Sequence, residues 1–350
     1  MTPFRFKPLA FDNGFEMPDY WLWCPSVIRG PNGEFHLFAS RWPKSIPMHP
    51  GWMTHSEVVR AVAPSITGPY TFKEVVLPAR GPEYWDGRST HNPTIRFHGG
   101  RYYLFYTGST HPLPDLKKGE PFPSQDPRCI VARSMKRVGI AWAESLEGPW
   151  HRLDHPILPT EPDSPRSFLT SNPAPFIYPD GKTSLVFKQR AYRPESRDRL
   201  GFAECGEPTH GEMTLGLAEA PDPLGPYEVT LAKIDFPGNS ELEDPFLWRD
   251  EEGFHLLAKE LTGRLSGVPG GCLLAHSGEG RVWEFPEAPL AFRKEVSFED
   301  GSTLPLGSLE RPFLYFEAGR PTHLLAAASN GSITFTDASR TWIAVCPLEG

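Results

Sequence analysis

A short motif that ends in proline recurs five times along this chain of 350 residues. Its copies are Trp23-Cys24-Pro25, His91-Asn92-Pro93, Ser171-Asn172-Pro173, Glu243-Asp244-Pro245 and Glu310-Arg311-Pro312. The prolines at 25, 93, 173, 245 and 312 are therefore 68, 80, 72 and 67 residues apart. A fixed period of this length predicts a fold built from five similar structural units.

Short apolar strands and turn residues surround each motif. In the first unit, residues 25–28 and 35–40 flank a turn at residues 30–33, and its Asn-Gly step is a strong hairpin signal. Three units also share a Gly-Pro-aromatic connection, at residues 68–70, 148–150 and 225–227. A Gly-Pro step presets a turn, and we expect the aromatic residue after it to pack between neighbouring sheets. No long helical period interrupts this pattern.

These units predict an all-β fold, a five-bladed β-propeller. We expect a single domain over residues 1–350, with blades starting near residues 24, 92, 172, 244 and 311. A two-sheet sandwich or a solenoid would also contain such strands, but neither needs the same proline motif once per unit. The strand that closes the ring is expected from residues 1–22 or from residues 341–346.

Composition and charge exclude several classes of partner. The net charge is −8 and no basic run with interleaved aromatic residues occurs, so we expect no nucleic acid partner. No stretch approaches the roughly 20 apolar residues of a membrane helix, and no apolar leader is visible, so we expect a cytoplasmic protein. The five cysteines form no C-x-x-C pair, which argues against a disulfide framework and a zinc ribbon. The oligomeric state is left open.

The five motif pairs are expected to meet at one end of the propeller axis. In a propeller the innermost strand of each blade lines the axis, and the residues before each proline are expected to start that strand. Nine of these ten residues are polar, charged or a thiol, where a buried strand start would normally be apolar. Such convergence is expected of a ligand site.

The repeated strand starts and the Gly-Pro-aromatic connections resemble the five-bladed propeller glycosidases, namely glycoside hydrolase family 43 and its relatives, families 62 and 117. The resemblance covers about residues 23–350 and implies hydrolysis of furanosides or related sugars. It implies that Glu243 is the catalytic acid. Two positions depart from the family pattern: Cys24 stands where the resemblance implies an aspartate base, and Asn172 where it implies a second aspartate.

Glycoside hydrolysis needs two carboxyl groups with separated pKa values. We expect Glu243 to be the acid, and Glu310 or Asp244 to be the base or nucleophile. Two structural alternatives stay open, an ion pair between Glu310 and Arg311 and a turn-capping role for Asp244. Residues expected to bind the substrate are His91, Asn92, Asn172, Arg311, Trp23, Arg41, Trp85, Asp86 and Arg190.

No cofactor is required by this chemistry, and no cluster has the spacing of metal ligands. The resemblance adds the expectation of a calcium ion near the axis, which His91 could anchor. Arg311 could instead hold an acidic sugar or phosphate. Two long polar insertions, residues 111–137 and 190–212, are expected to wall one side of the site.

The sequence therefore predicts a carbohydrate partner and an exo-acting glycoside hydrolase that releases a terminal sugar. Two alternatives remain at this point. One is a carbohydrate-binding propeller without catalysis, because two expected carboxylates are missing. The other is a glycoside phosphorylase that depends on phosphate.

Overall fold

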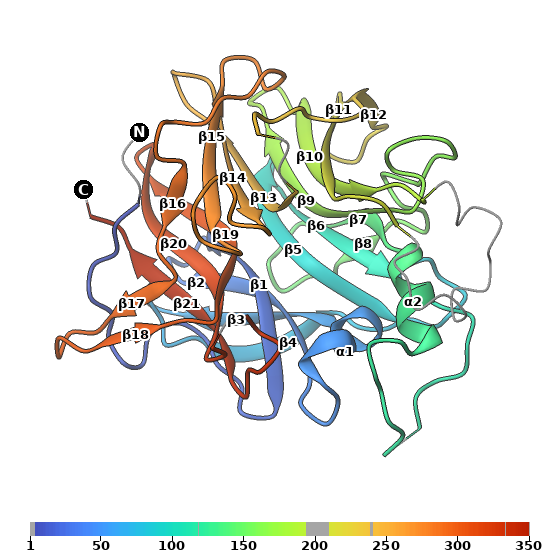
Figure 1. The fold of residues 1–350 in the computed structure, drawn as a ribbon, viewed down its shortest axis with the longest axis horizontal. Coiled ribbons are helices and arrows are strands. Elements are labelled where there is room, and N and C mark those ends of the chain that lie inside the picture. The colour runs from blue at the N-terminus through green and yellow to red at the C-terminus, as the bar shows by residue number, and fades with distance from the viewer. Residues whose placement is uncertain (1–3, 118, 194–209, 239–240, 333, 350) are drawn as a thin grey trace.

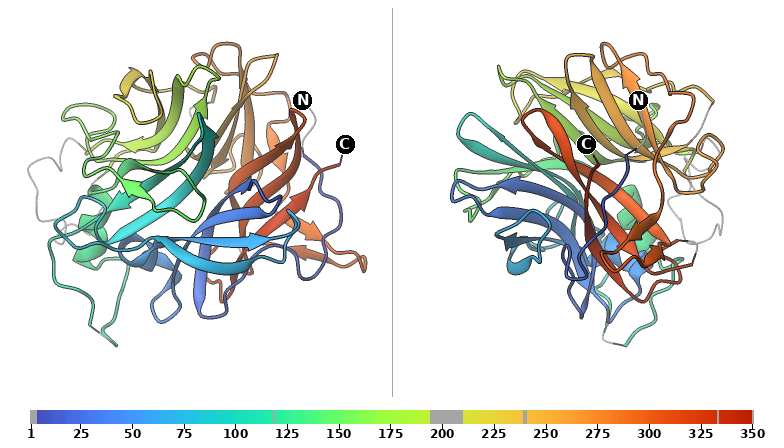
Figure 2. Two further views of the ribbon diagram at one scale, coloured as in Figure 1. Left: turned by 180° about the vertical axis from the view of Figure 1, so that it is seen from behind. Right: turned by 90° about the vertical axis from the view of Figure 1, so that its left-hand side faces the viewer.

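In a computed structural model, the chain forms the predicted five-bladed β-propeller (Figure 1). The structure describes residues 4–117, 119–193, 210–238, 241–332 and 334–349. Each blade is an antiparallel sheet whose strands follow one another in chain order, and the sheets stand around a common axis (Figure 2). Contacts between neighbouring blades run through their innermost strands.

The innermost strands are β1 (Tyr20–Arg29), β5 (Ser89–His98), β9 (Leu169–Ile177), β13 (Leu242–Arg249) and β19 (Ser308–Glu317). The second strands are β2 (Phe35–Pro43), β6 (Arg101–Ser109), β10 (Thr183–Arg190), β14 (Phe254–Glu260) and β20 (Arg320–Ser329). The outer strands are β3 (Glu57–Ala63), β4 (Thr71–Leu77), β7 (Arg137–Ala143), β8 (His151–Arg152), β11 (Thr214–Ala220), β12 (Glu228–Leu231), β15 (Cys272–Ser277), β16 (Leu290–Phe292) and β21 (Thr341–Pro347). A separate hairpin, β17 (Glu295–Ser297) and β18 (Thr303–Pro305), precedes the last blade.

The motif pairs lie inside the innermost strands, which corrects the expectation that they start them. Each innermost strand begins one to three residues before its pair. The pairing register with the second strand shifts at every pair, which is the mark of a β-bulge. The ladder resumes after the proline, so the proline occupies a bulge, where its missing N–H costs no ladder hydrogen bond.

Both ends of the chain close the ring at blade five. The described part of that blade contains three strands, and Phe15 pairs with Ile343 on the free edge of β21 through hydrogen bonds of 3.0 and 2.8 Å. Gly14 has a φ of 83°, and a Cβ there would lie 1.9 Å from the Ile343 carbonyl oxygen. Glycine is therefore required for this close approach.

Apolar side chains fill the space between neighbouring blades, as expected of a propeller. The prediction for the Gly-Pro-aromatic connections is confirmed at Trp150, whose ring packs edge-on against Phe38 of blade one at 5.7 Å. The four described cysteines, Cys24, Cys129, Cys272 and Cys346, are buried free thiols.

Within the described ranges, two short helices interrupt the strands, and sequence periodicity did not predict them. They are α1 (Met48–His55) and α2 (Pro127–Ser134), and they pack against each other through Met53, Cys129 and Ala132. Asp126 caps α2 by accepting from the Arg128 N–H at 2.8 Å, and Pro127 occupies the first turn. Among the described residues, no helix has the length and apolarity to cross a membrane.

Candidate active site

The residue directly before each motif proline has a left-handed backbone conformation. The φ angles are 57° at Cys24, 54° at Asn92, 52° at Asn172, 52° at Asp244 and 59° at Arg311. Non-glycine residues adopt this conformation at a cost in energy, and it is often found at functional sites. The repeated bulge sends the two members of a pair to different places: the second members line a small cavity on the axis, whereas four of the first members line a larger one.

The second members form what we call the axial ring, which consists of Cys24, Asn92, Asn172, Asp244 and Arg311. From Cys24 to Asn172, each side chain donates a hydrogen bond to the ring member of the next blade. The Cys24 thiol donates to Asn92 Oδ1 (2.8 Å), Asn92 Nδ2 donates to Asn172 Oδ1 (2.6 Å), and Asn172 Nδ2 donates to Asp244 Oδ1 (2.8 Å). The Arg311 guanidinium completes the series by pairing with the same Asp244 oxygen. Buried polar groups that satisfy one another in this way fix their side chains in one arrangement.

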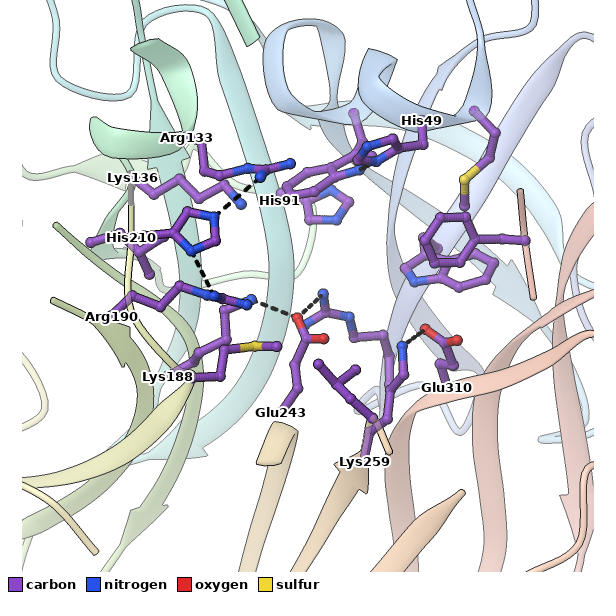
Figure 3. Close-up of a pocket in the computed structure, with 18 of the residues that line it drawn as sticks. His49, His91, Arg133, Lys136, Lys188, Arg190, His210, Glu243, Lys259 and Glu310 are labelled. Carbon is purple, nitrogen blue, oxygen red and sulfur yellow. Dashed lines mark hydrogen bonds and ion pairs between the residues drawn. The ribbon is translucent and has the colours of Figure 1, made fainter. Parts of the chain in front are cut away.

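The larger cavity has a volume of about 240 Å³ and lies between the axial ring and the two insertions. Its first-member residues are Trp23, His91, Glu243 and Glu310. Figure 3 shows Arg133, Lys136, His210 and Arg190 on one side of the cavity and Lys259 with Glu310 on the other. Both insertions contribute to the wall, as expected, through residues next to α2 and β10; residues 194–209 of the second insertion lie outside the described part of the chain.

Glu243 and Glu310 face this cavity from neighbouring blades, and each is ion-paired. Lys188 Nζ lies 2.5 Å from Glu243 Oε1, and Lys259 Nζ lies 2.6 Å from Glu310 Oε2. Burial by itself raises the pKa of Glu243, but the surrounding cations, Lys188 first among them, hold that pKa well below its ordinary value. Glu243 is therefore an anion in the free protein. The alternative ion pair between Glu310 and Arg311 is not the one that forms.

Asp244 belongs to the axial ring and does not line the larger cavity. Burial raises its pKa to about 7, against the effect of the Arg311 guanidinium. Its second oxygen, Oδ2, is buried and has no hydrogen-bond partner in the described structure. Asn92 and Asn172, which were expected to bind substrate, are held in the same ring. Their amide groups bond each other and their neighbours instead of facing the cavity.

Neutral imidazoles and aromatic rings form the remaining walls. His91 is buried, and burial lowers its pKa well below the ordinary value. Its Nδ1 lies 2.8 Å from the Ser56 hydroxyl, and its ring stacks on Trp52 at 5.0 Å. Trp52 Nε1 donates to His49 Nδ1 at 3.2 Å. Trp23 lines the cavity as predicted, so an apolar platform is available for the face of a sugar ring.

Three predicted substrate-binding residues lie away from the cavity. Arg41 pairs with Glu57 at 2.8 Å and stacks over Tyr20, so neighbouring strands of the same blade neutralise its charge. Asp86 is fully buried and bonds Arg80 and Tyr106, while Trp85 stacks on the same tyrosine. Arg190 and Arg311, by contrast, do line the cavity.

The residues that sequence reasoning missed are mostly basic: His49, Arg133, Lys136, His210 and Lys259. One signal could have found some of them. In blades one to four, the residue of the second strand that pairs with the first member of the motif reaches the motif of the next blade. Ser40 accepts from the Asn92 N–H (3.1 Å), and Thr107 accepts from the Asn172 N–H (3.0 Å). Lys188 and Lys259 occupy the same positions in blades three and four.

A calcium ion on the axis does not fit these residues. Calcium takes six to eight oxygen ligands. In the axial ring the one carboxylate is already paired with the Arg311 guanidinium, a cation in the place that the metal would need. His91 contacts Ser56, Trp52 and the Cys24 thiol, which lies 3.4 Å from Nε2, and this is not a set of hard oxygen donors.

Comparison with known proteins supports the fold. No family model and no curated protein matches the chain. Among solved structures, Zg3597, a family 117 glycoside hydrolase from the marine bacterium Zobellia galactanivorans, is 19% identical, with a TM-score of 0.64 over 99% of this chain and 90% of that protein. The structure of a BT0996 RGII complex is 13% identical, with a TM-score of 0.62 over 98% of this chain and 91% of the matched one.

CoXyl43, a GH43 β-xylosidase/α-arabinofuranosidase from a compost microbial metagenome in complex with xylotriose, is 14% identical, with a TM-score of 0.58 over 99% and 98% of the two chains. At these identities the similarity establishes the fold. The chain has the five-bladed propeller fold of glycoside hydrolases of families 43 and 117, and the resemblance predicted from the motifs is confirmed at that level.

Proposed function

We propose that this protein is an exo-acting glycoside hydrolase that releases a terminal sugar, a furanoside or a related ring, from an oligo- or polysaccharide. One observation carries the proposal. Glu243 and Glu310 face a single cavity from neighbouring blades, within a fold shared with glycoside hydrolases. Enzymes that hydrolyse a glycosidic bond generally need two carboxyl groups at one sugar-sized site.

The shape of the cavity supports release of a terminal sugar. One member of the axial ring, Arg311, lies in its lining, and the cavity volume of about 240 Å³ is small for a ligand site. Trp23 offers apolar surface in the lining. A cavity of this size suits a single sugar ring, whose apolar face can stack on this tryptophan.

The charge state of Glu243 assigns its part in the proposed reaction. Because neighbouring cations keep it ionised, Glu243 enters the reaction as the base or nucleophile rather than as the acid first expected. Glu310 is then the proton donor to the leaving oxygen, and Lys259 must release it before it takes up a proton. The expectation from the sequence was the opposite: the family resemblance implied that Glu243 is the acid, and Glu310 was expected to be the base or nucleophile.

The test is hydrolysis of a broad glycan panel that includes furanosides, followed by reducing-sugar release. We expect Glu243→Gln and Glu310→Gln each to lower turnover on the order of 10²- to 10⁴-fold. Glu219→Gln is the matched control, because this carboxylate pairs with Lys182 on the outside of blade three and does not line the cavity. Turnover that survives Glu243→Gln would remove the catalytic assignment.

A second function, carbohydrate binding without hydrolysis, is favoured by one specific observation. Both cavity carboxylates are ion-paired with lysines, and Cys24 and Asn172 occupy the positions of the two expected aspartates. Sugar binding by calorimetry with no product from any glycan in the panel would select this function. Mutation of Glu243 would then change affinity and leave no activity to measure.

A further inference from the structure

The larger cavity carries more positive than negative charge. Among the described residues, its lining contains six cationic side chains, Arg133, Lys136, Lys188, Arg190, Lys259 and Arg311, and two carboxylates, Glu243 and Glu310. Ion pairs with these two carboxylates use Lys188, Lys259 and Arg311. In the part of the chain that the structure describes, Arg133, Lys136 and Arg190 form no ion pair with a carboxylate.

These three unpaired cations gather around one imidazole, and we call Arg133, Lys136, Arg190 and His210 the basic cluster (Figure 3). Arg190 Nη1 lies 2.7 Å from His210 Nδ1, and Arg133 Nη1 lies 3.4 Å from His210 Nε2. A neutral imidazole can accept through one nitrogen only, so it cannot satisfy two guanidinium donors at once. Burial and the two arginines lower the pKa of His210 to about 3, so it stays neutral and adds no counter-charge.

The excess of positive charge affects Lys136 most. This residue is buried, with only 4% of its surface accessible. Its ammonium lies 3.8 Å from the centre of the Trp52 ring, and the described residues provide no hydrogen-bond acceptor for it. Burial lowers its pKa well below the ordinary value, and Lys188 and Arg133 lower it further. A buried cation without an anion is costly, which indicates that the site is completed by a ligand.

The basic cluster is built into the fold rather than placed by chance on a surface. Arg133 belongs to the last turn of α2, whose buried face packs on α1. The Lys136 carbonyl accepts from the Thr170 N–H of β9 at 3.3 Å, and Arg190 is the last residue of β10 and donates to the Gly211 carbonyl at 2.8 Å. Two segments that are far apart in the chain therefore hold these cations on one wall.

We propose that the basic cluster is an oxyanion subsite of the cavity, which binds either the carboxylate of an acidic terminal sugar or a free inorganic phosphate. Guanidinium and ammonium groups are the donors that suit both ligands. Trp23 in the same lining provides an apolar surface beside the charge, which matches a sugar ring that bears a carboxylate. This inference rests on the proposed carbohydrate site and names the class of its substrate.

Equilibrium binding to the full chain tests the subsite without any need for catalysis. Calorimetry would compare glucuronate and galacturonate with glucose and galactose, and inorganic phosphate would be titrated separately. We expect at least one of these anions to bind, and the uronates to bind at least tenfold more tightly than their neutral counterparts if the carboxylate is the source. Lys136→Met should weaken the favoured anion by about ten- to a hundredfold.

Two further variants keep the experiment decisive. Arg133→Gln should weaken the same anion, and it guards against a folding defect peculiar to Lys136→Met. Lys44→Met is the matched control: Lys44 also lies over a tryptophan, Trp21, at 5.3 Å, but outside the cavity, so its loss should leave affinity unchanged. Binding of phosphate but not of uronates would support the subsite and identify phosphate as the source.

Equal affinity for uronates and neutral sugars, together with no phosphate binding, would overturn the subsite even if a neutral glycoside is hydrolysed. Anion binding that is unchanged in Lys136→Met and Arg133→Gln would also overturn it. Tight uronate binding without hydrolysis would support the subsite and count only against the hydrolase, so the two proposals fail separately.

Discussion

Replacing Lys188 with methionine should destabilise the protein by about 3 kcal/mol at neutral pH. Methionine keeps the length of the side chain but removes the ammonium that lies 2.5 Å from Glu243 Oε1. The side chains of the pair are only 7% and 13% exposed, so solvent compensates little. Removing one partner of a buried pair costs roughly 3–5 kcal/mol, and we expect the lower end because Arg311 remains 3.6 Å from Glu243.

The destabilisation should depend on pH in a defined direction. In the wild type the folded-state pKa of Glu243 is depressed, so its contribution to stability is present above the unfolded-state pKa, about 4.3, and is lost as pH falls through the lower folded-state value. In Lys188→Met, burial should raise that pKa above the unfolded-state value. The difference in stability between the two proteins should therefore be largest near pH 7.5 and shrink towards pH 4.5.

Urea denaturation at pH 7.5, 6.0 and 4.5 measures this directly, provided that the m-values agree. Lys182→Met is the control, because Lys182 is half exposed and pairs with Glu219 at 3.3 Å, and such pairs contribute about 0–1 kcal/mol. Adding Glu243→Gln to Lys188→Met should restore much of the lost stability. A Lys188→Met protein within 0.5 kcal/mol of the wild type at pH 7.5 would refute the argument that Glu243 is ionised and held by this lysine.

Two further predictions test the axis and the closure of the ring. Asn172→Leu should cost about 1–3 kcal/mol, because it removes the acceptor at 2.6 Å from Asn92 Nδ2 and leaves Arg311 as the remaining partner of Asp244 Oδ1; denaturant melts measure it, and a change below 1 kcal/mol would contradict the hydrogen-bond series. Gly14→Ala should lower the melting temperature by several degrees, because its Cβ would collide with the Ile343 carbonyl, and an unchanged melting curve would show that ring closure does not depend on this contact.

The fold could be predicted from the sequence because its repeat is local and physically constrained. Each motif proline marks a bulge in an innermost strand, and each Gly-Pro step marks a turn between outer strands, so the period of the chain is the period of the structure. The helices escaped prediction because α1 and α2 have eight residues each, too short for a helical period to emerge. Their apolar face is completed only by packing on each other.

The candidate site could be predicted only in part. The motif pointed to Glu243, Glu310, His91 and Trp23, because a position in an innermost strand implies proximity to the axis. It could not show that consecutive residues separate at the bulge, with Asp244 directed to the axial ring. The separation depends on a left-handed φ at a non-glycine residue. Asn and Asp favour this conformation more than most residues, but Cys24 and Arg311 adopt it too, so residue type alone does not predict it.

The basic residues of the cavity could not be predicted from the sequence for a different reason. Arg133 and Lys136 lie near the end of a long insertion, and their place in the cavity depends on how α2 packs rather than on the repeat. Arg41 and Asp86 show the opposite error: both looked available in the sequence, but local partners had already neutralised them. A charged residue therefore indicates a functional site only when its ion-pair partners in the folded protein are known.

The axial ring also links the five blades to one another. Each blade supplies one member, and its hydrogen bonds join residues 68, 80 and 72 positions apart in the chain. Closing such long loops costs entropy before any bond can repay it, so the ring forms only when consecutive blades are already in place. A duplicated or lost blade would add or remove one member of a series that runs from a thiol donor to a single carboxylate acceptor. The evolution of this propeller by blade duplication is therefore constrained at its axis, while the neighbouring motif residues remain free to acquire new chemistry.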